Sequence, residues 1–276
     1  MDIRQVSSPA ETRRFDSSQL RAAYLIEELF KSDEICMTYS HLDRTVVGGA
    51  MPGKSPLTLE SSKQIGSPRF LDRRELGIFN IGGPGRVVID NDTHELQRTD
   101  ALYVPMGTEA VAFISDDMAD PARFYFVSTP AHASYPARKI TADEANLINL
   151  GTQSDANVRV LRQYIHPDVC QSCQLTMGMT LIADGSVWNT MPCHTHDRRT
   201  EVYLYFNMAE KTRIIHLMGE PQETRHLVVA DQQAILSPGW SIHSGTGTGS
   251  YGFIWSMAGD NQDFDDMDFV AMEDLK

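Results

Sequence analysis

The segment DALYVPMGTEA, residues 100–110, aligns without a gap with QAILSPGWSIH, residues 233–243, so that Pro105 matches Pro238. An Arg-Arg pair precedes each segment, in RRELGIFNI (73–81) and in RRTEVYLYF (198–206), although a gap is needed to match both regions together. Two weak matches in the same order predict a β-domain that occurs twice in the chain. Chance similarity between apolar strands is the alternative interpretation.

Short β-rich runs, each bounded by Gly, Pro, Asn or Asp, occur in both halves of the chain. The first half contains GIFNIGG, GRVVID, DALYVP and ARFYFVSTP, and the second contains VYLYFNM, TRIIHLMG, HLVVADQQAILSP and SYGFIWSM. Many short strands with frequent turns indicate an all-β sandwich or barrel, because a βαβ fold would alternate strands with helices.

Helical patterns are few. The segment 16–30, DSSQLRAAYLIEELF, places apolar residues at helical spacing behind polar capping residues. Thr141 and Glu144 have the spacing of a capping box, which predicts a short helix in the connection between the halves. We therefore expect an N-terminal segment and β-domain over residues 1–140, and a linker and second β-domain over residues 141–276.

The 276-residue chain carries 24 basic and 37 acidic residues, a formal net charge of −13. Lys and Arg form no stripe, so binding to nucleic acid is not expected. No apolar run reaches the roughly 18 residues of a membrane span, and the N-terminal residues lack the apolar core of a signal peptide. The acidic tail, residues 259–276, is expected to be a solvated terminus, since it lacks the Gly and Glu of a calcium loop.

The four cysteines are Cys36, Cys170, Cys173 and Cys193. The CQSC motif at 170–173 has no second Cys pair at the spacing of a structural zinc site. It also lacks the surrounding βαβ pattern that a redox motif requires. Free thiols and the missing export signal predict a cytoplasmic protein.

The stretch MPCHTHDRRTEVYLYF, residues 191–206, contains a candidate metal site. His194 and His196 are two positions apart and would point to the same face of a strand. Glu201 has the opposite parity to His196, so a turn or bulge within 197–200 is needed to bring it to that face.

A fourth ligand, His243, follows a Pro-Gly turn in SPGWSIHSG, residues 237–245. Three imidazole nitrogens and one carboxylate oxygen suit Zn²⁺, Mn²⁺, Fe²⁺ or Ni²⁺. In the alternative interpretation these are polar residues at strand ends, satisfied by water and backbone. The first half has Ala110 at the position of His243 and contains no His-x-His motif, so one copy could bind metal while the other supplies only scaffold.

The pattern HxHx4E followed by P-x4-H resembles the paired motifs of the cupins, small β-barrels with a metal in the mouth. Two copies would make a bicupin of two jelly-roll-like barrels. Further motifs resemble the 5-keto-4-deoxyuronate isomerase (KduI) family over nearly the whole chain, with Asp197 in place of an expected Glu. These motifs are YSHLDR (39–44), RRELG (73–77), PCHTHDRRTEVYLYFN (192–207), MGEPQETRH (218–226), GWSIHSG (239–245) and FDDMD (264–268).

The resemblance implies one zinc ion per subunit, held by His194, His196, Glu201 and His243, although other divalent metals would fit. It also implies a homohexamer and a small-molecule keto-deoxyuronate as substrate, with no nucleic-acid or membrane partner. The reaction would interconvert 5-dehydro-4-deoxy-D-glucuronate and 3-deoxy-D-glycero-2,5-hexodiulosonate during pectin breakdown. In this aldose–ketose isomerisation the zinc would polarise the carbonyl and the neighbouring hydroxyl.

Several residues are candidates for the remaining chemistry. Tyr203 and Tyr205 share strand parity with Glu201 and could face the same cavity, while Glu223 and His226 are better proton acceptors near neutral pH. The substrate carboxylate favours an arginine, for which Arg199 and Arg225 are candidates. Barrel packing of both tyrosines and surface exposure of the arginines are the alternatives.

Two other classes of protein would use a similar scaffold. A metal-dependent cupin dioxygenase would have the same ligands with iron, and metal content and oxygen consumption would distinguish it. A non-enzymatic sugar-binding cupin would have no need of a complete ligand set.

Overall fold

The computed structural model describes residues 1–276, and the chain divides into two compact units. Unit 1 comprises Met1–Ile3, Glu28–Asn146 and Gln163–Met177, and unit 2 comprises Arg4–Glu27, Leu147–Arg162 and Gly178–Lys276. These units differ from the expected limits 1–140 and 141–276, chiefly because residues 4–27 belong to unit 2 and residues 163–177 to unit 1.

Unit 1 is built around a seven-stranded and a four-stranded sheet. The strand order of the first is β1 (Asp2–Arg4), β3 (Ile35–Ser40), β4 (Val46–Ala50), β11 (Phe124–Pro130), β6 (Arg74–Asn80), β9 (Ala101–Val104) and β12 (Arg138–Ile140). The second has the order β5 (Leu57–Thr58), β10 (Val111–Ser115), β7 (Gly85–Ile89) and β8 (Asp92–Leu96). Apolar side chains from both sheets form one core, in which Phe113 packs on Phe124 and Phe126 at ring-centroid distances of 5.4 and 5.8 Å.

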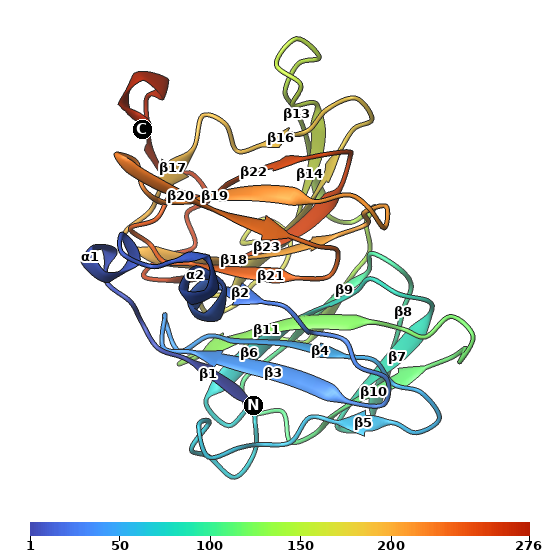
Figure 1. Ribbon diagram of the computed structural model, residues 1–276. Helices are drawn as coiled ribbons and strands as arrows, with labels where there is room; N and C mark the ends of the chain where they lie inside the picture. The colour runs from blue at the N-terminus through green and yellow to red at the C-terminus, as the bar shows by residue number, and fades with distance from the viewer. The chain divides into compact units, whose positions relative to one another are not determined.

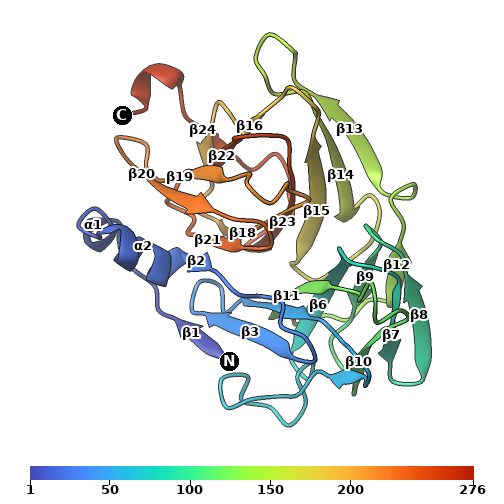
Figure 2. The ribbon, with the colours of Figure 1, turned by 45° about the vertical axis from the view of Figure 1, so that its right-hand side comes forward.

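Unit 2 repeats this arrangement (Figure 1). Its seven-stranded sheet has the order β13 (Asn146–Leu150), β14 (Arg159–Ile165), β15 (Thr176–Ile182), β23 (Gly252–Gly259), β18 (Arg199–Phe206), β21 (Ala234–Ser237) and β2 (Leu25–Ile26). Figure 2 shows β13, β14 and β15 side by side. The four-stranded sheet has the order β16 (Trp188–Asn189), β22 (Ser244–Gly247), β19 (Ile214–Glu220) and β20 (Glu223–Val229), and β17 (His194–Thr195) pairs separately with β24 (Asp268–Phe269).

Helices are limited to α1 (Pro9–Thr12), α2 (Ser17–Tyr24) and the 3₁₀ turn η1 (Met272–Asp274). The prediction of an all-β bicupin, with two jelly-roll-like barrels and a few short helices, is therefore confirmed. None of these helices combines the length and apolar character that crossing a bilayer requires.

Helix α2 explains why an N-terminal segment belongs to unit 2. Asp16 caps it as predicted, by accepting a hydrogen bond from the backbone N–H of Gln19 at 2.8 Å. The helix is shorter than the predicted 16–30, because the chain becomes extended at Leu25 and pairs with Ile235 of β21. Leu20 and Tyr24 are buried in the core of unit 2, and Figure 1 shows α2, in blue, beside the orange strands of this unit.

The predicted short helix at Thr141 is absent. Thr141 and Glu144 do form the expected bond, from the backbone N–H of Thr141 to Glu144 Oε2 at 2.8 Å. The segment closes only a single turn before strand β13 begins at Asn146, so no helix propagates.

Strand register supports the internal duplication residue by residue. Leu76 of β6 pairs with Val104 of β9, and Glu201 of β18 pairs with Ser237 of β21. Val104 and Ser237 occupy matching positions, each just ahead of the matched Pro105 and Pro238. Leu76 therefore takes the place of Glu201 in unit 1, and by the same register Arg74 takes the place of Arg199.

Each barrel contains a glycine packed under a core aromatic ring. A methyl group on Gly48 would lie 2.2 Å from Cζ of Phe126, its partner across the β4–β11 pair. In unit 2, a methyl group on Gly178 would lie 2.1 Å from Cζ2 of Trp255. Both rings are buried, so neither can move away freely.

We expect Gly48→Ala and Gly178→Ala each to lower the free energy of unfolding by roughly 1–3 kcal/mol, because overpacking displaces a rigid ring. Urea or thermal denaturation measures the loss, with the exposed substitution Lys54→Ala as control. Wild-type stability in either glycine variant would show that its ring adjusts without cost.

Candidate metal centre

Four side chains from separate parts of unit 2 meet at one end of its barrel. His194 lies on β17, His196 directly after it, Glu201 on β18, and His243 directly before β22. The predicted turn between His196 and Glu201 is present at residues 197–198, where the backbone N–H of Arg199 donates to the His196 carbonyl at 3.0 Å. This turn changes the parity of the chain and points Glu201 toward both histidines.

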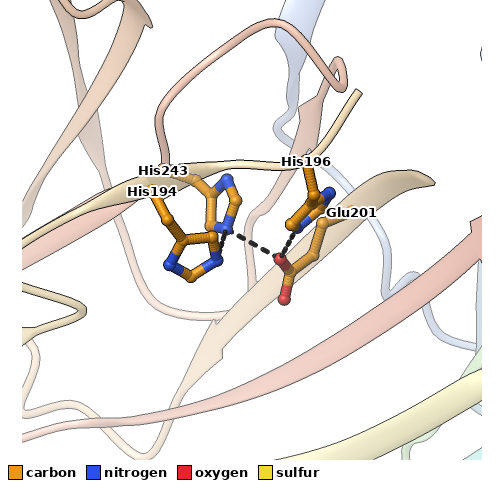
Figure 3. A group of neighbouring side chains, drawn as sticks. All are labelled: His194, His196, Glu201 and His243. Carbon is orange, nitrogen blue, oxygen red and sulfur yellow. Dashed lines mark hydrogen bonds and ion pairs between the residues drawn. The ribbon is translucent and has the colours of Figure 1, made fainter. Parts of the chain in front are cut away.

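The four donor atoms lie within 4.8 Å of one another (Figure 3). Glu201 Oε2 is 3.0 Å from His196 Nε2 and 2.9 Å from His243 Nε2. His243 Nε2 is also 2.9 Å from His194 Nε2. All four side chains are buried, with exposed fractions of 7% or less.

This donor set fits a divalent cation. Two imidazole nitrogens at 2.9 Å leave room for at most one proton between them, so at least one lone pair points at the shared centre. His196 Nδ1 donates to the Arg199 carbonyl at 2.9 Å, so in the neutral ring Nε2 is the unprotonated atom and is directed toward Glu201. Three nitrogens and one carboxylate oxygen are typical ligands of transition metals.

Electrostatics favour the protonation states that metal ligands need at His194 and Glu201, whereas the pKa of His196 is raised, because burial lowers it less than the hydrogen bond and charge of Glu201 raise it. Burial, together with the neighbouring His243, lowers the pKa of His194 to about 2, so this ring is neutral near pH 7. Burial raises the pKa of Glu201, but His243 and His196 lower it more strongly and the net direction is downward. A neutral imidazole and an ionised carboxylate are both ready to bind a cation.

The site opens onto a cavity of about 360 Å³ within unit 2. Its walls are largely apolar and aromatic, with Tyr203, Phe253 and Trp255 contributed by strands β18 and β23. Two guanidinium groups, those of Arg159 and Arg199, also line it. A mostly apolar cavity with a few polar groups is the usual form of a small-molecule site.

Of the other residues predicted for the site, Arg199 and Tyr203 line this cavity. Glu223, Arg225 and His226 lie on β20 and do not. Glu223 and His226 are exposed, and Arg225 donates to the carbonyls of Arg13 and Phe15 at 3.0 and 2.5 Å. β20 pairs with β19 and contributes no residue to the cavity lining, so membership of the MGEPQETRH motif does not imply contact with the cavity.

Sequence reasoning missed several residues of the cavity. The acidic tail is not simply a solvated terminus, because Phe264, Met267 and Phe269 all line the cavity. Phe269 pairs with His194 across the β17–β24 ladder, a contact between segments with no detectable sequence relation. Arg159 and Trp255 were not predicted as cavity residues. The only sequence signal for them was their place in the strands β14 and β23.

The CQSC cysteines lie outside the metal centre, in unit 1. All four cysteines are free thiols. Cys173 Sγ lies 3.3 Å from His132 Nδ1, and burial raises the pKa of Cys170 to about 11.

Fold and site together define a bicupin in which one barrel carries a candidate metal centre. Residues 24–272 match the KduI/IolB family, and the chain belongs to this family. An IolB-like protein from Salmonella typhimurium has the same fold, with a TM-score of 0.69 at 14% identity over 91% of this chain and 97% of that one. Oxalate decarboxylase from Lactobacillus farciminis shares the fold at 9% identity, with a TM-score of 0.57 over 83% of this chain and 79% of that one.

Relatives of higher identity cover the full length. The 4-deoxy-L-threo-5-hexosulose-uronate ketol-isomerase 1 of Rhizobium meliloti is 53% identical over 100% of this chain and 99% of its own. The ketol-isomerases of the same name from Escherichia coli O8 and Halalkalibacterium halodurans are each 50% identical over 100% of both chains.

We expect His243→Ala to weaken binding of a divalent metal at least about 100-fold, because it removes one of four converging donors. Elemental analysis and zinc titration of purified protein measure the effect. The matched control is His226→Ala, which removes an exposed histidine outside the cavity and should keep wild-type metal content. Equal metal content in both variants would contradict the assignment of the site.

Proposed function

We propose that this protein is a ketol-isomerase that interconverts 5-dehydro-4-deoxy-D-glucuronate and 3-deoxy-D-glycero-2,5-hexodiulosonate, with one zinc ion per subunit. The single observation that carries this proposal is the buried set of three histidines and one glutamate opening onto a cavity lined by Arg199. Relatives named as ketol-isomerases of a hexosulose-uronate, about half identical over the full length, support the substrate class.

His194, His196, Glu201 and His243 are the proposed ligands. A zinc ion held there would act as a Lewis acid toward the carbonyl and the neighbouring hydroxyl of the substrate. Nitrogen-rich sites of this kind also accept other divalent metals, so elemental analysis of purified protein identifies the resident ion.

Arg199 is the proposed partner of the substrate carboxylate. Its side chain is 1% exposed, and only Nη2 has an acceptor, the Asp266 carbonyl at 2.7 Å. Nε and Nη1 are buried without a hydrogen-bond partner. Unpaired N–H groups on a buried guanidinium are costly, and a carboxylate in the cavity would accept a charge-assisted hydrogen bond from one of them.

The first barrel provides an internal comparison. Arg74, at the position of Arg199, donates Nε to Ser128 Oγ at 3.1 Å and Nη2 to the Ser128 and Arg44 carbonyls at 2.7 and 2.6 Å. Met257 stands at the position of Ser128, by the pairing of each with the matched strands, and has no oxygen in its side chain. The arginine is therefore satisfied by protein in unit 1 but keeps free donors in unit 2.

Tyr203 is the proposed proton carrier, because it is the one predicted candidate that lines the cavity. Burial raises the pKa of its hydroxyl well above the usual value, so the group stays protonated and donates. The Tyr203 hydroxyl could donate a hydrogen bond to a substrate oxygen. That oxygen gains negative charge while a hydrogen moves between adjacent carbons of the substrate. Glu223 and His226, on β20, do not line this cavity.

The alternative functions have less support. A cupin dioxygenase would use the same ligands, but the full-length relatives that are about half identical to this chain are named ketol-isomerases. A sugar-binding cupin without activity would not need an ionised carboxylate and three imidazoles converging in a buried site. We further propose a cytoplasmic homohexamer, as the family resemblance implies; native mass spectrometry tests the assembly.

Removal of the metal should abolish isomerase activity on the unsaturated uronate released from pectin oligomers, because no other group in the cavity can polarise the carbonyl as strongly. The assay compares purified, chelator-treated and zinc-restored protein, with oxygen consumption as a parallel readout. Full activity in metal-free protein, or oxygen uptake without isomerisation, would contradict the proposal.

Substitutions should separate binding from chemistry. Arg199→Met removes the charged partner of the carboxylate and should raise KM roughly 10- to 100-fold. Tyr203→Phe should lower kcat about 100-fold with KM nearly unchanged. Tyr205→Phe is the matched control, since Tyr205 lies on the same strand but bonds His216 at 2.7 Å outside the cavity. Wild-type kinetics in either test variant would remove that residue from the mechanism.

A further inference from the structure

Residues 260–270, called here the strap, form part of the cavity wall although none of them is buried. The strap leaves β23 after Gly259 and contributes Phe264, Met267 and Phe269 to the lining of the cavity. Phe264 packs on Trp255 at 5.4 Å, and Phe269 packs on the His194 ring at 5.9 Å between centroids. The strap therefore contacts both a wall residue and a metal-ligand candidate.

Few backbone bonds hold the strap in place. Its only regular structure is the two-residue strand β24, in which Phe269 pairs with His194 and Asp268 with Thr195. The backbone N–H of Val270 donates to the Cys193 carbonyl at 3.0 Å, and that of Asp260 donates to the Arg198 carbonyl at 2.9 Å. A segment with no buried side chain and so short a ladder belongs to the least stable parts of a fold.

Arg198 supplies the main side-chain anchor. Its Nε lies 2.9 and 3.1 Å from the two carboxylate oxygens of Asp266, and its Nη2 lies 2.6 Å from Asp266 Oδ1. Nη2 also donates to Asp268 Oδ2 at 2.9 Å. Asn261 donates to Asp266 Oδ2 at 2.6 Å, so the strap is tied to itself at the same carboxylate. A guanidinium that engages two carboxylates fixes both distance and orientation.

Asp266, which Arg198 binds through the carboxylate, also accepts a hydrogen bond from Arg199. The Asp266 carbonyl is the single protein acceptor of the Arg199 guanidinium, at 2.7 Å. Arg198, in the turn before β18, is partly exposed and does not line the cavity, whereas Arg199, the first residue of β18, is buried and lines it. One aspartate thus joins the outer arginine, through its carboxylate, to the inner arginine, through its backbone.

We propose that Arg198 is a positioning residue: its ion pairs with Asp266 and Asp268 hold the strap over the metal centre and aim the Arg199 guanidinium into the cavity. The role of Arg199 toward a carboxylate substrate rests on the proposed function, whereas the covering of the site by the strap does not. Arg198 touches no part of the cavity itself, so its effect on a substrate passes through the strap.

Three variants of the metal-loaded, full-length protein test this proposal. Arg198→Ala and Asp266→Ala remove the two sides of the main ion pair, and Arg198→Gln keeps side-chain bulk should the alanine variant fold poorly. The matched control is Arg21→Ala, which breaks a similar fork on Glu27, at 3.2 and 2.7 Å, elsewhere in unit 2. Melting temperature and metal content confirm that each variant is folded and loaded.

Three readouts are compared. Hydrogen exchange at residues 260–270 should rise at least about tenfold in the test variants, as expected when a local anchor is lost. Release of metal to a chelator should accelerate about tenfold, since the cover opens more often. KM for the keto-uronate should rise about tenfold with kcat within about twofold, because Arg199 is aimed less well. Arg21→Ala should change none of these.

The double variant Arg198→Ala/Asp266→Ala should show an effect clearly smaller than the sum of the two single ones, because the Arg198–Asp266 ion pair that both remove is lost only once. Additive effects, or wild-type exchange in the single variants, would overturn the proposal. Faster exchange with unchanged KM and unchanged metal release would also overturn it, since the strap would then neither retain the metal nor position Arg199. If the wild type shows no isomerase activity, the proposed function fails, while exchange and metal release still decide the role of Arg198.

Discussion

Three imidazoles and a carboxylate directed at one buried point impose the main constraint on this molecule. An ionised glutamate in an apolar barrel is strongly unfavourable unless a cation or several donors face it. Here the facing groups are the rings of His196 and His243, whose Nε2 atoms lie 3.0 and 2.9 Å from Glu201 Oε2. The turn at residues 197–198, the placement of His243 before β22 and the pairing of β17 with β24 all serve to bring these groups together.

The two barrels show that scaffold and chemistry are separable. Their strands share register, and each packs a glycine under a core aromatic ring. The differences lie at single positions: Leu76 replaces Glu201, Ala110 replaces His243, and Ser128 replaces Met257. Apolar or self-satisfied residues keep unit 1 stable without a ligand. Unit 2 contains buried imidazole nitrogens without a proton to accept and buried N–H groups without an acceptor. Such unsatisfied groups lower stability and are common in binding sites.

Local patterns allowed much of this structure to be predicted. Alternation and turn residues indicated the strands, and the His-x-His spacing with a following Glu required the observed turn. Contacts between segments that are distant in sequence could not be predicted from local patterns. The tail reads as acidic and solvated because its partner Arg198 lies 68 positions away from Asp266, and no periodicity reveals such an ion pair. Glu223 and His226 do not line the cavity, because proximity in sequence does not specify which side chains of a hairpin reach it.

The position of helix α2 and strand β2 has a consequence for how the protein is made. Arg21, at the end of α2, bonds the Val228 carbonyl across 207 positions of sequence, and β2 completes the sheet of unit 2 at β21. In a growing chain Arg21 is made 207 positions ahead of its partner Val228. The strands of unit 1 are made in between and can pair first, whereas α2 and β2 stay without their partners until β20 and β21 have been made. The barrel that carries the candidate metal centre therefore closes after those strands have paired.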